Sequence, residues 1–200
     1  MIKIVLATRN KNKIKELKTF FNELSSLDIQ VLSLDDIGFL GEIEESGRTF
    51  EENAISKASV PAKLGYIGIA DDSGLCVDAL GGAPGIYSAR FSGGNDEDNN
   101  DLLLKKLENE SDRSAKYVCA MACVFPDHSK DFTVRGECYG KILTERHGEG
   151  GFGYDPLFYF EPFGTTFAEV DMSKKNKVSH RGIAMKSLIK KLTKVLTNDK

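Results

Sequence analysis

Apolar runs and helical patterns alternate along the first part of the chain. Residues 2–7 are mostly β-forming apolar side chains, which predicts a buried strand. After a polar loop, apolar residues recur every three or four positions from Ile14 to Leu24, the spacing of an amphipathic helix. A second strand is expected over 29–34. The order strand, polar loop, helix is one that can hold an anion at the helix N-terminus.

The middle of the chain carries a helix start signal and then a strand followed by acids. Thr49-x-x-Glu52 is a capping box, so a helix is expected to begin at Phe50. Residues 66–70 predict a short buried strand that leads directly into the segment 71–74, with the sequence DDSG.

The second half is expected to contain two helices and three strands. They are a helix over 96–110 with an acidic first turn, strands over 115–125, 131–143 and 157–160, and a final helix from about Gly182. The residues PDHS between the first two strands predict an antiparallel hairpin. The whole pattern predicts a single mixed α/β domain over 1–200, with a twisted sheet flanked by helices.

Composition and charge narrow the class of protein. Hydrophobic residues make up 40% and charged residues 28%, which is ordinary for a globular domain. The net charge of -3 argues against nucleic acid as a partner. No apolar stretch reaches the roughly 18 residues that span a membrane. The four cysteines form no CxxC pair, which favours free thiols in the cytoplasm. The short basic cluster over 174–181 is the one local exception to the mixed charge of the chain, and a solvated turn explains it as well as a binding site does.

Two polar segments are candidates for phosphate chemistry. The loop from Thr8 to Lys13 offers a hydroxyl, amides and ammonium groups for phosphate oxygens, although it is no Walker A loop. The adjacent carboxylates Asp71 and Asp72 repel each other and need a cation, for which Mg²⁺ is suited. Strand alternation would separate their side chains, one for catalysis and one for structure. The alternative is an Asx-type turn that closes the strand.

Two further segments could recognise a base. The loop Phe152-Gly-Tyr-Asp155 has two aromatic side chains that can sandwich a purine, although core packing is the commoner role. His180 and Arg181 can donate hydrogen bonds to carbonyl acceptors on a base edge.

Taken together, five blocks of sequence resemble one enzyme family. They are ATRNKNKIKEL, GRTFEENAISKA, IADDSGLCVDALGGAPGIYSARFSG, GFGYDPLF and KKNKVSHRG, and they extend from residue 5 to residue 185. In this order they resemble the inosine/xanthosine triphosphate pyrophosphatase family. The block DDSGL-x-V-x-ALGGAPG-x-YSAR is highly specific to it.

The resemblance implies an elongated α/β fold of two lobes with a central substrate cleft, as a homodimer. It implies Mg²⁺-dependent hydrolysis of ITP, dITP and XTP to the monophosphate and pyrophosphate, which cleanses the nucleotide pool. It does not say which of the three substrates matters most or how many magnesium ions act.

The resemblance also implies site residues. Asp72 matches the general base, and Glu45 matches a magnesium ligand together with Asp72, with Glu44 or Glu42 as alternatives. Lys175 matches a substrate-binding lysine, with Lys177 as the alternative. The remaining residues that it implies contact the substrate are Thr8, Arg9, Asn10, Lys11, Asn12, Lys13, Ser73, Phe152, Gly153, Tyr154, Asp155, His180 and Arg181.

Three other functions compete with this prediction. The nearest is a pyrophosphatase for modified pyrimidine or ordinary nucleotides, which a panel of triphosphates would distinguish. A non-catalytic nucleotide sensor would bind without releasing pyrophosphate, and it would not need a water-activating acid. A nucleic-acid-binding protein would show a steeply salt-dependent affinity for DNA.

Overall fold

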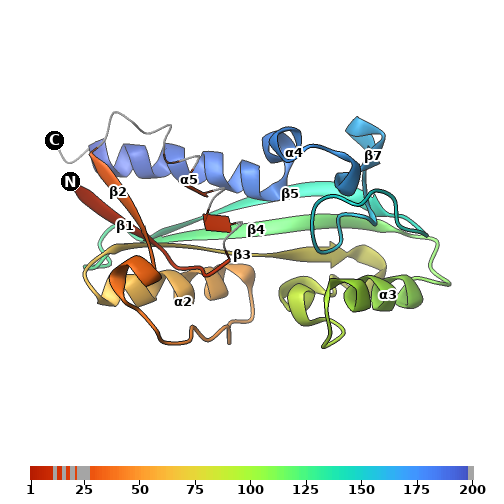
Figure 1. Ribbon diagram of the computed structural model, residues 1–200, viewed down its shortest axis with the longest axis horizontal. Helices are drawn as coiled ribbons and strands as arrows, with labels where there is room; N and C mark the ends of the chain where they lie inside the picture. The colour runs from red at the N-terminus through yellow and green to blue at the C-terminus, as the bar shows by residue number, and fades with distance from the viewer. Residues whose placement is uncertain (11–12, 15–16, 19–20, 22–27, 198–200) are drawn as a thin grey trace. The chain divides into compact units, whose positions relative to one another are not determined.

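The computed structural model describes residues 1–10, 13–14, 17–18, 21 and 28–197, and the described strands form a mixed sheet (Figure 1). Its strand order is β2-β1-β3-β4-β5-β6-β7. Strand β1 pairs in parallel with β2 and β3, whereas β6 pairs antiparallel with β5 and β7. The strands are β1 (Ile2–Leu6), β2 (Ile29–Ser33), β3 (Ile67–Val77), β4 (Ser114–Val124), β5 (Phe132–Ile142), β6 (Phe158–Phe160) and β7 (Thr165–Thr166). The mixed sheet with flanking helices confirms the predicted α/β class.

Helices account for most of the remaining regular structure. They are α2 (Phe50–Lys63), α3 (Asp96–Lys106), α4 (Met172–Val178) and α5 (His180–Thr197). In the segment where a first helix was expected, the described residues from Lys13 to Phe21 are helical, while Leu24 lies outside the described residues. No described helix is long and apolar enough to cross a membrane.

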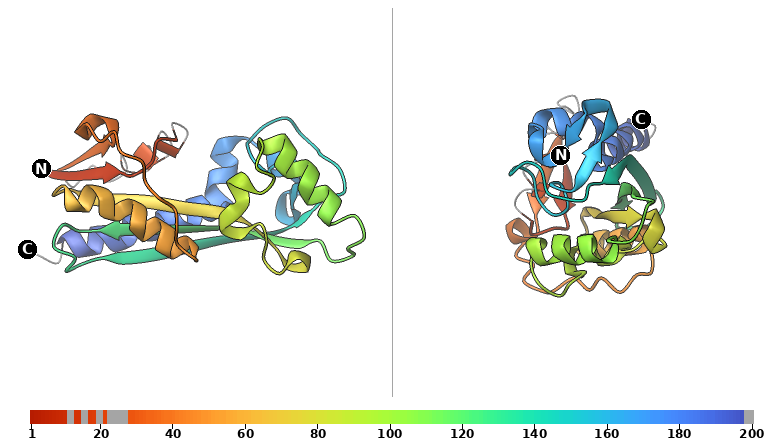
Figure 2. Two further views of the ribbon diagram at one scale, coloured as in Figure 1. Left: turned by 90° about the horizontal axis from the view of Figure 1, so that it is seen from below. Right: turned by 90° about the vertical axis from the view of Figure 1, so that its right-hand side faces the viewer.

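The chain divides into two compact units. Unit 1 comprises 1–72, 120–135 and 184–200, and unit 2 comprises 73–119 and 136–183. In unit 1, α2 and α5 lie on opposite faces of the sheet (Figures 1 and 2). The core on the α2 side is built from small residues, Ala54, Ala58 and Ala62 among them, packed on β1, β3 and β4.

The core of unit 2 is rich in aromatic residues. Helix α3 covers one face of its strands and α4 lies on the other (Figures 1 and 2). Leu103 and Leu107 from the α3 side are fully buried in the same cluster as Tyr117, Phe158 and Phe167. Apolar residues on both sides of the strands therefore hold the loops of this unit in place.

Helix α2 begins and packs for identifiable reasons. Thr49 Oγ1 accepts a hydrogen bond from the Glu52 N–H at 3.1 Å, as the capping box predicts. The Glu52 carboxylate accepts instead from the Arg48 N–H at 2.7 Å, so the expected return bond to Thr49 is replaced by one a residue earlier. Helix and strand then approach closely at Gly68, where a Cβ would lie 1.9 Å from the Ala58 carbonyl oxygen.

Strand β3 corrects one prediction. The strand does not end at residue 70 but continues through Asp71 and Asp72 to Val77, so the alternative of an Asx turn is also wrong. It continues because Leu75 and Val77 are fully buried, which makes the second half of the strand part of the core of unit 2. Helix α4 and strand β7 were not predicted, and α5 begins at His180 rather than near Gly182.

Candidate functional site

In unit 1, three carboxylates and two lysines form what we call the acid cluster: Glu45, Asp71, Asp72, Lys13 and Lys57. Lys13 Nζ lies 2.8 Å from Asp71 Oδ2. Lys57 Nζ lies 3.1 Å from Asp72 Oδ1 and 2.7 Å from Glu45 Oε1. The two adjacent aspartates thus bind different lysines, as their alternation along β3 predicts.

Asp72 is the most enclosed of the acids that share Lys57. Its Oδ2 accepts a hydrogen bond from Asn53 Nδ2 at 3.0 Å, and the residue is 7% exposed. Burial raises the pKa of Asp72 above its ordinary value, although the Lys57 ammonium and the Asn53 amide pull in the opposite direction. Asp72 is therefore a better proton acceptor than an ordinary aspartate.

Lys57 remains a cation inside this cluster. Its burial alone would lower its pKa, but the carboxylates of Asp72, Glu45 and Asp71 outweigh that effect and raise it. Its side chain is 9% exposed, and that of Glu45 is 36% exposed. The single positive charge of Lys57 thus faces two carboxylates, of which that of Glu45 is the more exposed to solvent.

Sequence reasoning missed both Lys57 and Asn53. They are separated by four residues on α2, so they lie on the same face of the helix as the buried residues Ala54 and Ala58. A lysine and an asparagine within an apolar stripe were the signal that could have revealed them. Gly47 supports Asn53, because its N–H donates to Asn53 Oδ1 at 2.8 Å.

The N-terminal loop contributes its own hydrogen bonds. Asn10 Oδ1 accepts from the Lys13 N–H at 3.2 Å, so Asn10 caps the helical segment that follows. Thr8 Oγ1 accepts from the Asn10 N–H at 3.2 Å. Arg9 donates to the carbonyl oxygen of Gly41 at 2.8 Å, which connects this loop to the segment before Glu45. The other two predicted loop residues, Lys11 and Asn12, lie outside the described residues.

Among the candidate magnesium ligands, Glu45 contacts a lysine of the acid cluster. Glu42, Glu44 and Glu45 are all exposed, and the carboxylate of Glu45 contacts Lys57 Nζ at 2.7 Å. No set of three or more metal-ligating side chains occurs in the described part of the chain.

In unit 2, a buried aspartate organises what we call the aromatic cluster: Phe152, Asp155, Lys175, His180 and Arg181. Asp155 is 1% exposed and forms an ion pair with Lys175 Nζ at 2.5 Å. Its Oδ2 also accepts from the Phe152 N–H at 3.0 Å. Asp155 thus fixes the backbone of the loop and holds the Lys175 ammonium next to it.

Phe152 presents its ring on the surface of this cluster. The residue is 43% exposed. Lys175 Nζ lies 4.7 Å and the Arg181 guanidinium 5.7 Å from the ring centroid, both within cation–π range. Arg181 also donates to Ser73 Oγ at 3.2 Å. An exposed ring beside a guanidinium is suited to stacking on a flat ligand.

His180 is held by an aromatic partner that sequence reasoning did not identify. Its ring stacks on Tyr117, with centroids 4.7 Å apart and planes at 13°. Burial and the Asp155 carboxylate raise the pKa of Tyr117 well above its ordinary value. Its hydroxyl therefore stays protonated and donates to Asp155 Oδ1 at 3.3 Å. Tyr117 lies in an apolar strand, where nothing in the sequence distinguishes it from core packing.

Not every predicted residue reaches the surface of the site. Tyr154 is buried in the core of unit 2, and its hydroxyl donates to the Ser88 carbonyl oxygen at 2.8 Å. The basic segment is not simply a solvated turn, because Lys175 and Arg181 are buried while Lys174 and Lys177 are exposed. The structure therefore favours Lys175 over Lys177 for a role beside Asp155.

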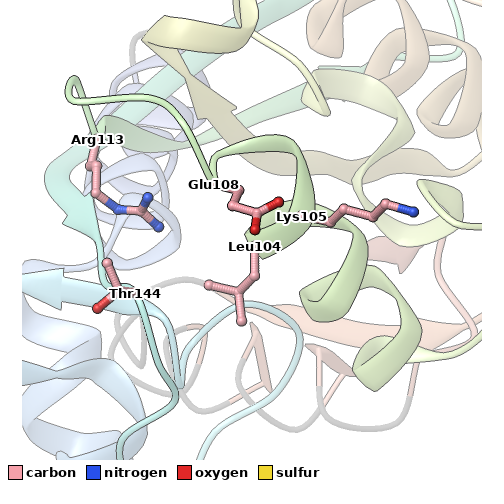
Figure 3. Close-up of a pocket in the computed structure, with 5 residues that line it drawn as sticks. All are labelled: Leu104, Lys105, Glu108, Arg113 and Thr144. Atoms are coloured by element: carbon pink, nitrogen blue, oxygen red, sulfur yellow. The ribbon is translucent and has the colours of Figure 1, made fainter.

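A pocket in unit 2 lies apart from these residues. It is lined by Leu104, Lys105, Glu108, Arg113 and Thr144 (Figure 3). Arg113 donates to the carbonyl oxygens of Leu107, Ile142 and Leu143 at 2.6–3.0 Å. Its guanidinium thus fastens the loops around the pocket, which is a structural role.

The chain is thus an α/β protein with a mixed sheet, two buried aspartates each paired with a lysine, and an exposed aromatic loop residue beside an arginine. Residues 4–191 match the model of the Ham1 family, and the chain belongs to this family. This confirms the resemblance inferred from the sequence blocks.

Known proteins similar to the chain cover nearly its whole length. A dITP/XTP pyrophosphatase from Desulfotalea psychrophila is 50% identical over 91% of this chain and 81% of the relative. Another from Desulforamulus reducens is 48% identical over 97% of both. Among solved structures, a HAM1 protein from Coxiella burnetii matches with a TM-score of 0.90 at 38% identity, covering 97% of this chain and all of that one.

Proposed function

We propose that this protein is a nucleoside triphosphate pyrophosphatase that hydrolyses noncanonical purine triphosphates, dITP, ITP and XTP, to the monophosphate and pyrophosphate. The relatives named dITP/XTP pyrophosphatase support the activity and the substrate class. The observation that carries the proposal is Asp72, a buried acid with a raised pKa, held between Lys57 and Asn53.

In this proposal Asp72 is the general base. It takes a proton from water as the water oxygen attacks the α-phosphorus, and the bond to the leaving pyrophosphate breaks. A carboxylate whose pKa is raised toward the working pH is a better base than an exposed one. The ammonium groups of Lys57 and Lys13 offset negative charge on the triphosphate. Thr8, Arg9 and Asn10 belong to the loop that we propose contacts the phosphates, together with Lys11 and Asn12.

The acid cluster has the chemistry that magnesium requires. Glu45 and Asp72 direct carboxylate oxygens at a single cation, Lys57, so two hard ligands already converge. Mg²⁺ is commonly held by one or two carboxylates together with substrate phosphates, so the two ligands are sufficient. We propose that Glu45 and Asp72 hold it. When bound, the ion would neutralise charge on the phosphates and polarise them.

The aromatic cluster is proposed to bind the purine. Phe152 would stack on the base, while His180 and Arg181 donate to its 6-keto oxygen. Adenine carries an amino donor at that position, so the same donors would face a donor. A mismatch of buried polar groups costs about 1–3 kcal/mol per contact, roughly a 5- to 150-fold loss. Ser73, Lys175 and Asp155 position Arg181 and the loop.

We also propose a cellular location and an oligomeric state. The free cysteines, of which Cys119, Cys123 and Cys138 are buried, support a cytoplasmic location. We propose a homodimer from the family resemblance alone. A light-scattering mass of a single chain would refute it.

Pyrophosphate release tests the function directly. The substrates are ITP, dITP, XTP, GTP and ATP, each with Mg²⁺ and with a chelator. We expect fast, magnesium-dependent release from the first three and little from GTP or ATP. Uniform rates would overturn the proposed base recognition, and binding without release would favour a sensor.

A further inference from the structure

Two residues of α3 hold both polar groups of one glycine in the aromatic loop. Asp96 Oδ2 accepts from the Gly153 N–H at 2.9 Å, and Asn100 Nδ2 donates to the Gly153 carbonyl oxygen at 3.0 Å. Asp96 and Asn100 are separated by four residues and so lie on the same helix face. The loop next to Phe152 is therefore fastened to a helix more than 50 residues earlier in the sequence.

Gly153 is the point where this fastening determines the shape of the loop. Its φ is +61°, a left-handed conformation that glycine adopts at little cost. On either side, the Phe152 N–H is bound by Asp155 and the Tyr154 hydroxyl by Ser88. The backbone of the loop is thus held from several directions while the Phe152 ring is exposed.

Helix α3 is itself a firm support. Its N-terminus has a full capping box between Asn95 and Asp98. Leu103 is fully buried in the core of unit 2. Arg146 forms ion pairs with Glu97 at 3.0 Å and Asp101 at 2.6 Å, which are exposed and add little. The core contact and the cap fix the helix, and the helix fixes the loop.

We propose that Asp96 and Asn100 are positioning residues that set base selectivity by holding Phe152 in place. The inference rests on the proposed role of the aromatic cluster in binding the purine. Asn100 is fully buried, and among the described residues its Oδ1 has no hydrogen-bond partner. Of the two polar atoms of this buried amide, the donor Nδ2 makes a hydrogen bond, and its acceptor is the Gly153 carbonyl oxygen.

The two positions therefore require opposite chemistry. Asp96 supplies only an acceptor, so Asp96→Asn keeps an amide oxygen for the Gly153 N–H. Asn100 supplies only a donor, so Asn100→Asp places a carboxylate oxygen against the Gly153 carbonyl oxygen. Each substitution exchanges a single polar group at almost constant volume. If Asn100 only filled space, Asn100→Asp would lower stability, because it buries a carboxylate, but it would leave base selectivity unchanged; a positioning role predicts a change in selectivity as well.

The first test compares the ITP/ATP ratio of kcat/KM among variants. We expect Asp96→Asn to stay within about twofold of the parent, while Asn100→Asp narrows the ratio roughly 5- to 150-fold, the equivalent of one lost buried polar contact. The change should appear in KM for ITP more than in kcat. Asn99→Asp is the matched control, because it also buries a carboxylate on α3, and the hydrogen bonds of Asn99 are with Ser92 and Ala89 rather than with Gly153. Its ratio should be that of the parent at a lower Tm.

A second test measures the loop itself. The chain has no tryptophan, so Phe152→Trp introduces a single fluorescent reporter. Adding Asn100→Asp, or Asn100→Ala if the aspartate variant does not fold, should lower the anisotropy of that tryptophan. Adding Asp96→Asn should not. Unchanged anisotropy and an unchanged ITP/ATP ratio with either Asn100 variant would overturn the inference.

The same reporter separates this inference from the proposed function. If ITP fails to change the fluorescence of the Phe152→Trp protein, the proposed purine site at this loop is wrong. The anisotropy comparison between the Asn100 and Asp96 variants would still decide whether α3 positions the loop.

Discussion

The acid cluster and the aromatic cluster each contain a buried lysine–aspartate pair, but they use it differently. In the acid cluster Lys57 is shared by Asp72 and Glu45, so one cation serves two acids. With Asp71 and Lys13 included, three carboxylates face two ammonium groups, which leaves one negative charge. This excess of negative charge favours the binding of an additional cation, such as Mg²⁺.

In the aromatic cluster the sharing is reversed. Asp155 is a single acceptor for the Lys175 ammonium, the Tyr117 hydroxyl and the Phe152 N–H. Arg181 adds a second positive charge beside the Phe152 ring. The excess of donors favours a ligand with carbonyl acceptors. Similar ion pairs thus leave an excess of negative charge in the acid cluster and an excess of hydrogen-bond donors in the aromatic cluster, which suit the proposed metal and the proposed base respectively.

The largest effect is expected from Asp72→Asn. It keeps the size of the side chain but removes the base, so turnover should fall about 10²- to 10⁴-fold while substrate binding persists. Steady-state pyrophosphate release and nucleotide binding measure the two separately.

Asp78→Asn is the control for that variant, since Asp78 follows the same strand and is exposed. It should retain parental turnover. Substantial activity in Asp72→Asn would remove Asp72 from the role of base.

Removing either buried lysine tests the comparison directly. Lys57→Met and Lys175→Met should each cost about 3–5 kcal/mol of unfolding free energy, because a buried carboxylate loses its cation. We expect Lys175→Met to be the less stable, since the Asp155 side chain is 2% exposed against 10% for Asp72. Lys57→Met should lose more turnover. Urea unfolding and kcat measure the two effects.

The controls for this pair are exposed lysines on the same helices. Lys63→Met on α2 and Lys177→Met on α4 should change unfolding free energy by no more than about 0.5 kcal/mol. Equal stability and equal turnover in the two buried-lysine variants would show that the clusters do not differ as argued.

The next largest effect is expected on base selectivity, when the proposed purine-binding donors are removed. Arg181→Ala and His180→Ala remove donors proposed to face the 6-keto oxygen, so each should raise KM for ITP and narrow the ITP/ATP ratio roughly 5- to 150-fold. Kinetics with both nucleotides provide the measurement. Lys190→Ala, an exposed change on α5, should leave the ratio alone. If the ITP/ATP ratio of kcat/KM is unchanged in the first two variants, other residues must recognise the base.

The sequence was informative where a local pattern determines structure. The apolar runs predicted β1 and β2 within a residue, and the cap at Thr49 predicted the start of α2. It failed where distant contacts decide: β3 continues past Asp72 because the core of unit 2 buries Leu75 and Val77. The polar residues of the DDSG segment indicated the end of the strand, and tertiary packing overrode that local signal.

The site residues, too, were predicted where a sequence motif marks them and missed where distant contacts define them. Asp72 and Glu45 were predicted through the family resemblance, whereas Lys57 and Tyr117 were missed. The role of Lys57 depends on α2 packing against β3, a contact that no sequence spacing encodes. Tyr117 is one aromatic residue in an apolar strand until Asp155, 38 residues later, meets its hydroxyl.

The smallest effect is expected at Glu45, and it sharpens the contrast in charge. Glu45→Gln removes one negative charge from the acid cluster at a side chain that is 36% exposed. A unit charge and a divalent ion 4 Å apart in water interact by about 2 kcal/mol, and salt screening at this exposed carboxylate reduces that to about 1 kcal/mol, so the magnesium concentration for half-maximal pyrophosphate release should rise about fivefold. Glu44→Gln removes the same charge one residue earlier, from an exposed side chain, and should leave that concentration unchanged. An equal shift in both variants would mean that the cluster attracts magnesium only through its overall charge, and no shift in either would mean that the ion is held by other ligands.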